Sequence, residues 1–357
     1  MHNNKLKQVK VLIIDDSAFS RQTIKGILEK APNIEVAGVA VDGHDGMSKI
    51  LKSKPDVVTL DLEMPGMDGF TLLRWIMEER PLPVIVVSAY GDNTTVFKAL
   101  ELGAVDFVVK PTKKASSELW EIEKDLLRKV ADIASLRMEK LKRTISLLGR
   151  SELVSDFHSS GGNDIEMVAI GASTGGPAAI QTIVTRLQGN FPGAMIISQH
   201  MPRGFTKQFA NRLSKISAVM VKEAEHGEPV ENSKVLVCPG GNHMALERTG
   251  DKVFVAIKDS STNDRYIPSI DIMMKSASEI YGSKLMGIVL TGMGSDGKAG
   301  MLEIKKRGGF TIAESEESSI VFGMPQEVIV SGGANTVLPL EDIPAEIMKK
   351  IKKRTEV

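Results

Sequence analysis

The chain is poor in the features that mark secreted, membrane-spanning or nucleic-acid-binding proteins. It has one cysteine, Cys238, among 357 residues, which excludes an internal disulfide and makes a reducing, cytoplasmic location the default expectation. Lysine plus arginine and aspartate plus glutamate number 45 each, so no net charge draws the chain to nucleic acid. No apolar run reaches the ~18–20 residues of a membrane span, and residues 1–5 lack the apolar core of a signal peptide. Neither nucleic-acid binding nor direct membrane insertion is therefore expected.

The length and the apolar pattern of the chain predict two α/β domains. With 357 residues, of which 42% are hydrophobic, the chain is long enough for two domains of roughly 100–200 residues each. In residues 1–112 and again in 165–357, short apolar runs alternate with amphipathic segments. This alternation predicts a doubly wound (βα)5 domain followed by a Rossmann-like α/β domain with a parallel sheet. The expected strands are Val9–Ile14, Ile34–Val39, Val57–Leu60, Val84–Val87 and Phe107–Val109 in the first domain, and Met167–Gly171, Ala194–Ser198, Lys234–Val237, Val253–Ile257, Leu285–Leu290 and Phe310–Ala313 in the second.

The segment between the two domains, 113–164, has a different character. Glu118–Arg150 has the charged pattern of a helix, and Ser151–Asn163 is rich in serine and glycine without apolar periodicity. We therefore expect a linker that is first helical and then flexible.

Acidic residues follow two of the expected strands in the first domain. Asp15 and Asp16 end the first strand and Asp61 ends the third. Because the carboxyl ends of parallel strands share one edge of the sheet, these carboxylates are expected to converge there, with Mg²⁺ as the natural occupant. Ser88 and Lys110 end the fourth and fifth strands, where they would neutralise the oxygens of a phosphoryl group. Asp16 alone could equally be a helix N-cap, but five suitable residues together favour a phosphorylation site.

These residues carry a resemblance to a known family. Residues 9–112 resemble the receiver domain of two-component response regulators. The resemblance implies that Asp61 accepts a phosphoryl group from a histidine kinase and that Asp15 and Asp16 hold Mg²⁺. It also implies that Ser88 and Phe107 shift on phosphorylation. The matching segments are Leu12–Ser17, Leu60–Gly69, Val87–Ala89 and Val109–Pro111.

A possible nucleophile follows the first strand of the second domain. Gly171-Ala172-Ser173-Thr174-Gly175 has the form G-x-S-x-G. Small flanking residues allow a tight turn that exposes the hydroxyl, and the following helix offers backbone N–H groups to an oxyanion. The pattern alone is weak, because glycine and serine are common in such turns.

A base and an orienting acid are expected on the same sheet edge. His200 follows the strand 194–198, and Asp296 lies in the loop after the strand 285–290. His226 and His243 lie in glycine-containing turns, where a surface or capping role is expected. Cys238 ends an apolar run and is interpreted as a buried residue, not as a second nucleophile.

The loop that contains Asp296 also allows a competing interpretation. Gly292-Met293-Gly294-Ser295-Asp296-Gly297 is a G-x-G-x-x-G sequence between an expected strand and a helix, with Glu314 about twenty residues on. This is the dinucleotide-binding pattern. Against it, Asp296 would place a carboxylate where the ligand's pyrophosphate should lie. The order Ser…His…Asp also differs from that of α/β-hydrolases, so the motif does not assign that fold. From the residues alone, a triad and a nucleotide site both remain open.

A second resemblance favours the triad. Residues 165–350 resemble the catalytic domain of the chemotaxis protein-glutamate methylesterase/glutamine deamidase family, CheB. It implies that Ser173 is the nucleophile, His200 the base and Asp296 its orienting acid. The backbone N–H groups of Thr174 and Met293 are suggested as oxyanion donors. The matching segments are Ile170–Pro177, Gln199–Pro202, Phe205–Thr206, Pro239–His243, Pro268–Asp271, Leu290–Gly297 and Val321–Pro325.

The resemblance also implies an activity and partners. We expect a phosphorylation-activated serine hydrolase that removes methyl esters from glutamate side chains of chemoreceptors, deamidates receptor glutamines, and needs no cofactor in its hydrolase half. The phosphodonor would be the chemotaxis histidine kinase. The unphosphorylated receiver is expected to hinder access to Ser173, and phosphorylation of Asp61 to shift that equilibrium. The alternative is a receiver-controlled adaptor with an inactive hydrolase half.

Overall fold

The computed structural model describes residues 8–89, 93–110, 117–133, 136, 138–148, 165–261 and 263–351. The chain divides into two compact units, 1–145 and 146–357, and each is described by itself. The serine- and glycine-rich segment 151–163 of the expected linker lies outside the described residues. Within the described ranges, no helix is both long and apolar enough to cross a membrane.

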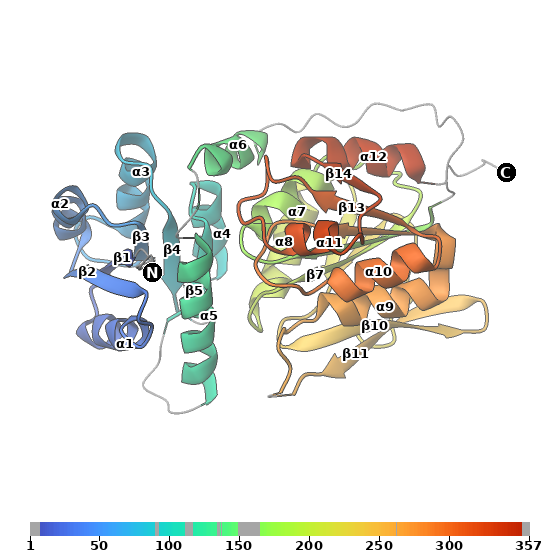
Figure 1. The fold of residues 1–357 in the computed structure, drawn as a ribbon, viewed down its shortest axis with the longest axis horizontal. Coiled ribbons are helices and arrows are strands. Elements are labelled where there is room, and N and C mark those ends of the chain that lie inside the picture. The colour runs from blue at the N-terminus through green and yellow to red at the C-terminus, as the bar shows by residue number, and fades with distance from the viewer. Residues whose placement is uncertain are drawn as a thin grey trace, which may run out of the picture. The chain divides into compact units, whose positions relative to one another are not determined.

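The first unit is built on a five-stranded parallel sheet (Figure 1). Its strand order is β2-β1-β3-β4-β5, so all five predicted strands are confirmed, each to within about one residue. In this order the chain changes direction between the neighbouring strands β1 and β3, which is where such folds bind ligands at the carboxyl ends of the strands. The elements are β1 (Val9–Ile14), α1 (Ala18–Leu28), β2 (Ile34–Ala40), α2 (Gly43–Ser53), β3 (Val57–Asp61), α3 (Gly69–Glu79), β4 (Val84–Ser88), α4 (Asn93–Glu101) and β5 (Asp106–Val109).

The charged segment expected to begin the linker forms two helices, α5 (Ser117–Ile133) and α6 (Met138–Leu148). The first of these packs against β5 and α1 and falls within the first unit. Leu126, Val130 and Ile133 on α5 are fully buried. The charged surface of α5 suggested a linker, but its apolar stripe covers the sheet, so α5 is the fifth helix of the (βα)5 fold.

The second unit is built on a seven-stranded sheet with the order β14-β13-β12-β6-β7-β9-β8. All of its strand pairs are parallel, which confirms the predicted α/β class. The chain changes direction between β6 and β12, so their carboxyl ends flank a crevice. The elements are β6 (Met167–Ala172), α7 (Gly176–Val184), β7 (Ala194–Gln199), α8 (Phe205–Ile216), β8 (Met220–Glu223), β9 (Lys234–Val237), β10 (Asn242–Thr249), β11 (Lys252–Asp259), α9 (Ile270–Tyr281), β12 (Leu285–Val289), α10 (Lys298–Lys306), β13 (Phe310–Glu314), α11 (Met324–Val330), β14 (Thr336–Leu338) and α12 (Ile343–Lys350).

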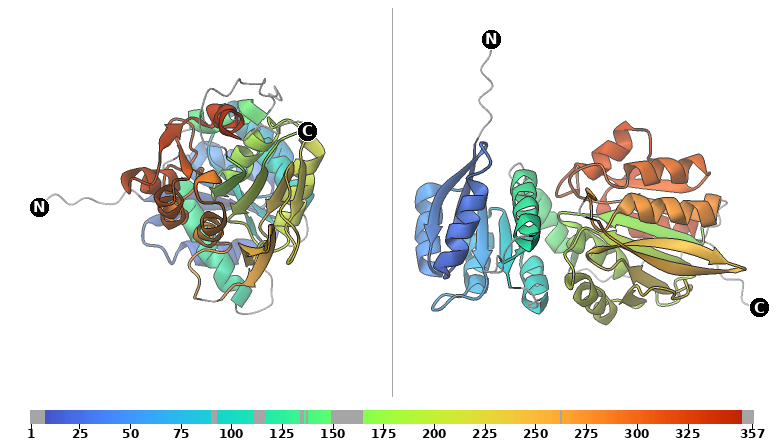
Figure 2. Two further views of the ribbon diagram at one scale, coloured as in Figure 1. Left: turned by 90° about the vertical axis from the view of Figure 1, so that its right-hand side faces the viewer. Right: turned by 90° about the horizontal axis from the view of Figure 1, so that it is seen from below.

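The run 253–257, expected as a strand of this alternation, belongs to a separate hairpin. It lies in β11, which pairs antiparallel with β10 in a two-stranded sheet that packs against α9 (Figures 1 and 2). Met244, Leu246 and Val255 of this hairpin join the core of the second unit. A short apolar run does not reveal its partner strand, which is why the sequence did not separate the hairpin from the main sheet.

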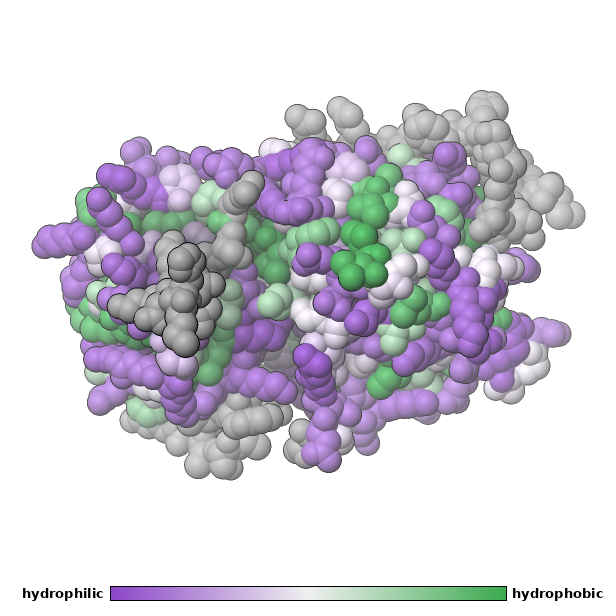
Figure 3. All heavy atoms as spheres, in the orientation of Figure 1, coloured by the Kyte–Doolittle hydropathy of each residue, from purple (hydrophilic) through white to green (hydrophobic). Residues whose placement is uncertain are grey.

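Figure 3 shows a face of the molecule covered largely by hydrophilic residues, with hydrophobic ones in small, separate groups. The exposed apolar side chains include Val330, with 80% of its surface accessible, and Met293, with 44%. Single exposed apolar residues are normal on protein surfaces, and Met293 differs from Val330 in lying in the predicted active-site loop.

The packing of α5 predicts a selective loss of stability in the first unit. Replacing Leu126 with alanine leaves a cavity against β5 and should cost about 2–4 kcal/mol of the free energy of unfolding. Both tryptophans of the chain, Trp75 and Trp120, lie in the first unit, so their fluorescence in urea reports on that unit alone. The exposed Lys124 on the same helix is the control, and Lys124→Ala should change stability by less than about 0.5 kcal/mol. Equal effects of the two variants would contradict the assignment of α5 to the first unit.

Candidate functional site

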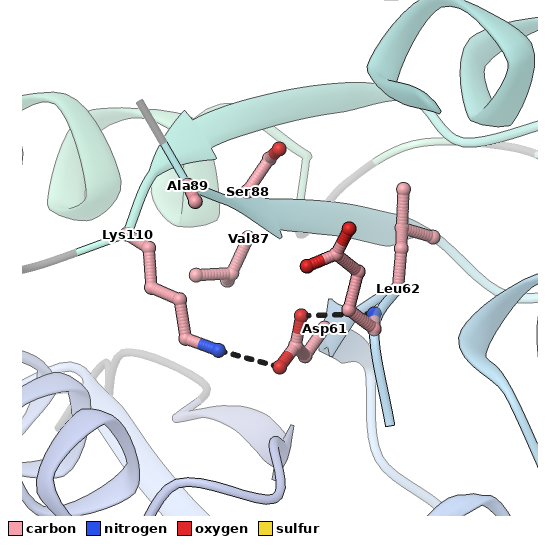
Figure 4. A pocket seen from close by; sticks show the side chains of 7 residues that line it. Asp61, Leu62, Val87, Ser88, Ala89 and Lys110 are labelled. Carbon is pink, nitrogen blue, oxygen red and sulfur yellow. Dashed lines mark hydrogen bonds and ion pairs between the residues drawn. The ribbon is translucent and has the colours of Figure 1, made fainter. Parts of the chain in front are cut away.

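The acidic residues predicted to converge in the first unit do so. Asp15, Asp16 and Asp61 each offer a carboxylate oxygen within 4.8 Å of the others. Asp15 and Asp61 are buried and Asp16 is exposed. The ammonium of Lys110 lies 2.5 Å from Asp61 Oδ2 and 3.4 Å from Asp15 Oδ1, and Figure 4 shows its side chain reaching toward Asp61 from the end of β5. The carboxyl ends of β1, β3 and β5 thus meet at one acidic site.

The charge on Asp61 is unfavourable in this environment. Burial and the neighbouring charge of Asp15 raise the pKa of the Asp61 carboxyl, and the hydrogen bond from Lys110 opposes this only in part. Burial opposes the charge of Lys110, but the two carboxylates outweigh burial and raise its pKa. Several carboxylate oxygens with one open side are the donor set that Mg²⁺ prefers, so these residues fit the predicted ion.

The two predicted switch residues occupy different places. Ser88 is buried at the end of β4 and lines the pocket together with Asp61 and Lys110 (Figure 4). Phe107 is only 1% exposed, is not among the residues that line that pocket, and has the ammonium of Lys129 at 5.0 Å from its ring centroid. That ammonium also donates to the carbonyl oxygen of Phe107. The structure therefore brings Ser88 to the pocket of Asp61 and Lys110 and places Phe107 in the core beside α5.

In the second unit the structure brings the three predicted catalytic side chains together. Ser173 follows β6, His200 follows β7 and Asp296 lies in the connection from β12 to α10. Ser173 Oγ is 3.1 Å from His200 Nδ1, and His200 Nε2 is 2.8 Å from Asp296 Oδ2. With the carboxylate accepting from Nε2–H, the lone pair on Nδ1 faces the serine hydroxyl. This is the geometry of a nucleophile, a base and an orienting acid.

The carboxylate of Asp296 is held by the N-terminus of α9. It accepts hydrogen bonds from the backbone N–H groups of Ile270 at 2.7 Å and Asp271 at 3.0 Å, and from the Ser269 hydroxyl at 3.2 Å. Burial opposes the charge, but the hydrogen bond and charge of His200, followed by these N–H groups, outweigh burial and lower the pKa of Asp296. The N-terminus of α9 is therefore occupied by the protein's own carboxylate.

The predicted oxyanion donors lie on two segments that touch at the nucleophile. Ser173 N–H donates to the carbonyl oxygen of Thr291 at 3.0 Å. A Cβ on Gly292 would lie 2.6 Å from Ser173 Cβ, so only glycine permits this approach. Met324 N–H donates to the carbonyl oxygen of Gly292 at 2.6 Å, which anchors the loop from the other side. Thr174 follows the nucleophile and is buried, and Met293 follows Gly292, whose backbone lies against Ser173.

Several residues that organise this site were not identified from the sequence. Gln199 donates to the carbonyl oxygens of Ser173 at 2.9 Å and His200 at 3.1 Å. The ring of Tyr266 stacks on the imidazole of His200. The matching segment Gln199-His200-Met201-Pro202 pointed to Gln199. Nothing in the spacing of residues indicated Tyr266.

His243 corrects a prediction. It was expected in a glycine-containing turn with a surface or capping role, but it lies in β10 with 3% of its surface exposed, so the turn and the surface role are wrong. Its Nδ1 accepts from Ser269 N–H at 3.0 Å and its Nε2 lies 3.0 Å from Asp264 Oδ2. The glycines before it suggested a turn, but the strand begins directly after them, and His243 helps to fix the residue that precedes α9.

Cys238 is buried, as predicted. It is completely inaccessible, and burial raises the pKa of its thiol far above the ordinary range. A thiol that stays protonated is a poor nucleophile, so Cys238 is a core residue and not a rival to Ser173.

Comparisons with known proteins agree with this geometry. The family model described as CheB methylesterase matches residues 168–347, and that of the response regulator receiver domain matches residues 11–119. A protein-glutamate methylesterase/protein-glutamine glutaminase of Geobacter sulfurreducens is 45% identical over 363 residues, which cover 97% of this chain and 98% of that protein. The chain belongs to the CheB methylesterase family.

Further CheB proteins support this assignment. The protein-glutamate methylesterase/protein-glutamine glutaminase of Pyrococcus abyssi is 41% identical over 350 residues, covering 97% of this chain and 94% of that protein. The crystal structure of the Thermotoga maritima CheB methylesterase catalytic domain is 42% identical, covers 52% of this chain and 99% of that chain, and has a TM-score of 0.51. These comparisons carry no support for the adaptor or the nucleotide-binding interpretation.

A buried acid beneath the active-site loop gives a prediction about pH. Burial raises the pKa of Glu314 to about 7, against hydrogen bonds from Ser318 Oγ and Thr291 N–H. Because the folded-state pKa lies above the unfolded value, this group's stabilisation is fully present below about pH 4.5 and is lost as pH rises through about 7. Between these two pH values, ionisation of this group should lower the free energy of unfolding by about 3 kcal/mol.

Replacing Glu314 with glutamine should remove this pH dependence, because the amide cannot ionise. Urea unfolding followed by circular dichroism should show the variant gaining stability relative to the wild type as pH rises from about 4.5 to 7.5. The exposed Glu317 on the same connection is the control, and Glu317→Gln should change nothing in this range. A constant difference between Glu314→Gln and the wild type at all pH values would contradict the raised pKa.

Proposed function

We propose that this protein is a phosphorylation-activated serine hydrolase that removes methyl esters from glutamate side chains of chemoreceptors and deamidates receptor glutamines. The observation that carries the proposal is the contact of Ser173 with His200 and of His200 with Asp296, at the crevice of a sheet in a chain of the CheB methylesterase family. Relatives at 41–45% identity are named for both activities.

The chemistry follows from the atoms that face one another. His200 Nδ1 takes the proton of Ser173 Oγ as the oxygen attacks the side-chain carbonyl carbon. The oxyanion accepts hydrogen bonds from the backbone N–H groups of Thr174 and Met293. Methanol leaves with the proton from His200, and water then hydrolyses the acyl-serine with His200 again as the base. With glutamine as the substrate, ammonia leaves in place of methanol. Asp296 holds the Nε2–H and stabilises the imidazolium throughout.

The receiver half supplies the regulation in this proposal. Asp61 accepts a phosphoryl group from a histidine kinase, so a P–O bond to its carboxylate forms as the bond to the donor histidine breaks. Mg²⁺ held by Asp15, Asp16 and Asp61 would neutralise charge at the phosphoryl oxygens. Lys110 and Ser88 border the same pocket and would contact those oxygens.

Removing the nucleophile should abolish methanol release. Ser173→Ala should lower the rate of methanol release from methylated chemoreceptor membranes by at least about 10³-fold, because the acyl intermediate cannot form. Asp296→Asn should lower kcat about 10⁴-fold, because the amide presents a donor to Nε2 and reverses the imidazole tautomer. Cys238→Ala, at a buried and unreactive site, is the control and should retain most of the activity. Activity in Ser173→Ala comparable to that of the control would favour the adaptor interpretation.

Phosphorylation of Asp61 should activate the full chain. A small phosphodonor such as acetyl phosphate, with Mg²⁺, should raise the initial rate of methanol release about fivefold or more. Asp61→Asn should keep the basal rate and lose the response, because its amide is no nucleophile. Asp56, which bonds Lys10 N–H at the other end of the sheet, is the matched control, and Asp56→Asn should respond like the wild type. A full response in Asp61→Asn would place the acceptor elsewhere.

A further inference from the structure

One aromatic ring touches both the base and the loop that carries its orienting acid. Tyr266 lies in the connection from β11 to α9. Its ring centroid is 5.3 Å from that of His200, and the two planes differ by 6°. This is an offset parallel stack within the usual range for aromatic pairs. The side chain of His200 is 6% exposed, so the stack lies in a site that little water reaches.

The stack favours the charged form of the imidazole over the neutral form. When His200 takes the proton of Ser173 it becomes a cation against the face of a tyrosine ring, and the ring attracts that cation. The neutral imidazole of the resting state gains less from the same ring. An interaction that is stronger in the transition state than in the ground state lowers the barrier.

The hydroxyl of Tyr266 makes a second contact, with the loop 292–297. Ser295 N–H donates to Tyr266 Oη at 3.3 Å. A Cβ on Gly294 would lie 2.4 Å from the same oxygen, and φ is +97° at that glycine, so the backbone there is shaped to receive the ring. This loop carries Met293, a proposed oxyanion donor, and Asp296.

We propose that Tyr266 is a positioning residue of the active site. Its ring keeps the His200 imidazole in the plane that joins Ser173 to Asp296 and favours the imidazolium, and its hydroxyl braces the loop that carries Asp296. The inference rests on the proposed role of His200 as the general base. Tyr266 makes two separate contributions: its ring acts on the base, and its hydroxyl acts on the loop.

Two substitutions in the full chain separate the effect of the ring from the effect of the hydroxyl. Tyr266→Phe keeps the ring but loses the hydroxyl that accepts from Ser295 N–H, so it should lower kcat by only about two- to threefold. Tyr266→Leu removes the ring and should lower kcat about five- to tenfold with little change in KM, because the loss falls on the transition state. Tyr281→Phe, at the C-terminal end of α9 and away from the site, is the control for loss of a tyrosine hydroxyl and should behave like the wild type.

The split between kcat and KM distinguishes this role from a purely structural one. Loss of a ring that acts on the base should lower kcat and leave KM nearly unchanged, whereas a disordered site should raise KM as well. The other charged groups around the stack are Asp296 at Nε2, Asp271 beside Asp296, and Arg265, whose guanidinium carbon lies 5.2 Å from the Tyr266 ring centroid. They remain in every variant, so the comparison isolates the ring. An unchanged kcat in an otherwise folded Tyr266→Leu would overturn the proposal.

A second measurement tests the role of Tyr266 independently of the proposed ester substrate. A fluorophosphonate labels a base-activated serine: a bond from Ser173 Oγ to phosphorus forms, the P–F bond breaks, fluoride leaves and the serine proton passes to His200. The labelling rate should fall more in Tyr266→Leu than in Tyr266→Phe, with Ser173→Ala unlabelled. Wild-type labelling without methanol release would refute the proposed ester substrate alone. Equal labelling rates in Tyr266→Leu and the wild type would refute the role of Tyr266 alone.

Discussion

The buried carboxylate of Asp296 is the interaction on which the catalytic unit depends. With 2% of its surface exposed, this charge would cost several kcal/mol without compensation. The compensation comes from His200 on one side and from the first N–H groups of α9 on the other. The position of α9 therefore sets the position of the carboxylate, and the carboxylate sets the orientation of the imidazole.

Because the carboxylate of Asp296 depends on the position of α9, the hairpin β10–β11 affects the site indirectly, by holding α9 in place. The hairpin packs along α9, and His243 at its start accepts from the N–H of Ser269, the residue that caps the helix. Packing of the hairpin and this one hydrogen bond fix the beginning of α9. A part of the second unit that lies outside the main sheet thus helps to hold the base against Ser173.

The parts of the molecule that follow from strand periodicity could be predicted from the sequence. Short apolar runs gave all five strands of the first unit, and the rule that parallel strands end at one edge brought Asp15 to Asp61 and Ser173 to His200. The parts that depend on tertiary partners could not be predicted. Because α5 has many charged residues, its buried apolar face was not recognised from the sequence. The apolar run of β11 did not indicate that β10 is the strand it pairs with.

The same limit applies to the side chains of the active site. The nucleophile, base and acid carry chemical signals that survive in the sequence, because few residue types can do their work. Tyr266 and His243 carry no such signal, because a tyrosine in a loop or a histidine in a strand has many possible functions. What distinguishes them is the face they present, a ring parallel to His200 in one case and a lone pair toward Ser269 N–H in the other.

The two carboxylates at the centres of the two sites have opposite electrostatics, although both lie at the carboxyl edge of a parallel sheet. Asp296 is buried, but the hydrogen bond and charge of His200, followed by the backbone N–H groups at the start of α9, lower its pKa, so its carboxylate is held charged beside the imidazole. Asp61 is buried beside Asp15, and its pKa is raised although Lys110 and the N–H of Glu63 donate to it, so a bound cation would relieve its charge. One architecture therefore holds a well-compensated charge in the second unit and a less compensated one in the receiver, because Asp296 accepts from His200 and two N–H groups of α9, whereas Asp61 accepts from Lys110 and one N–H group.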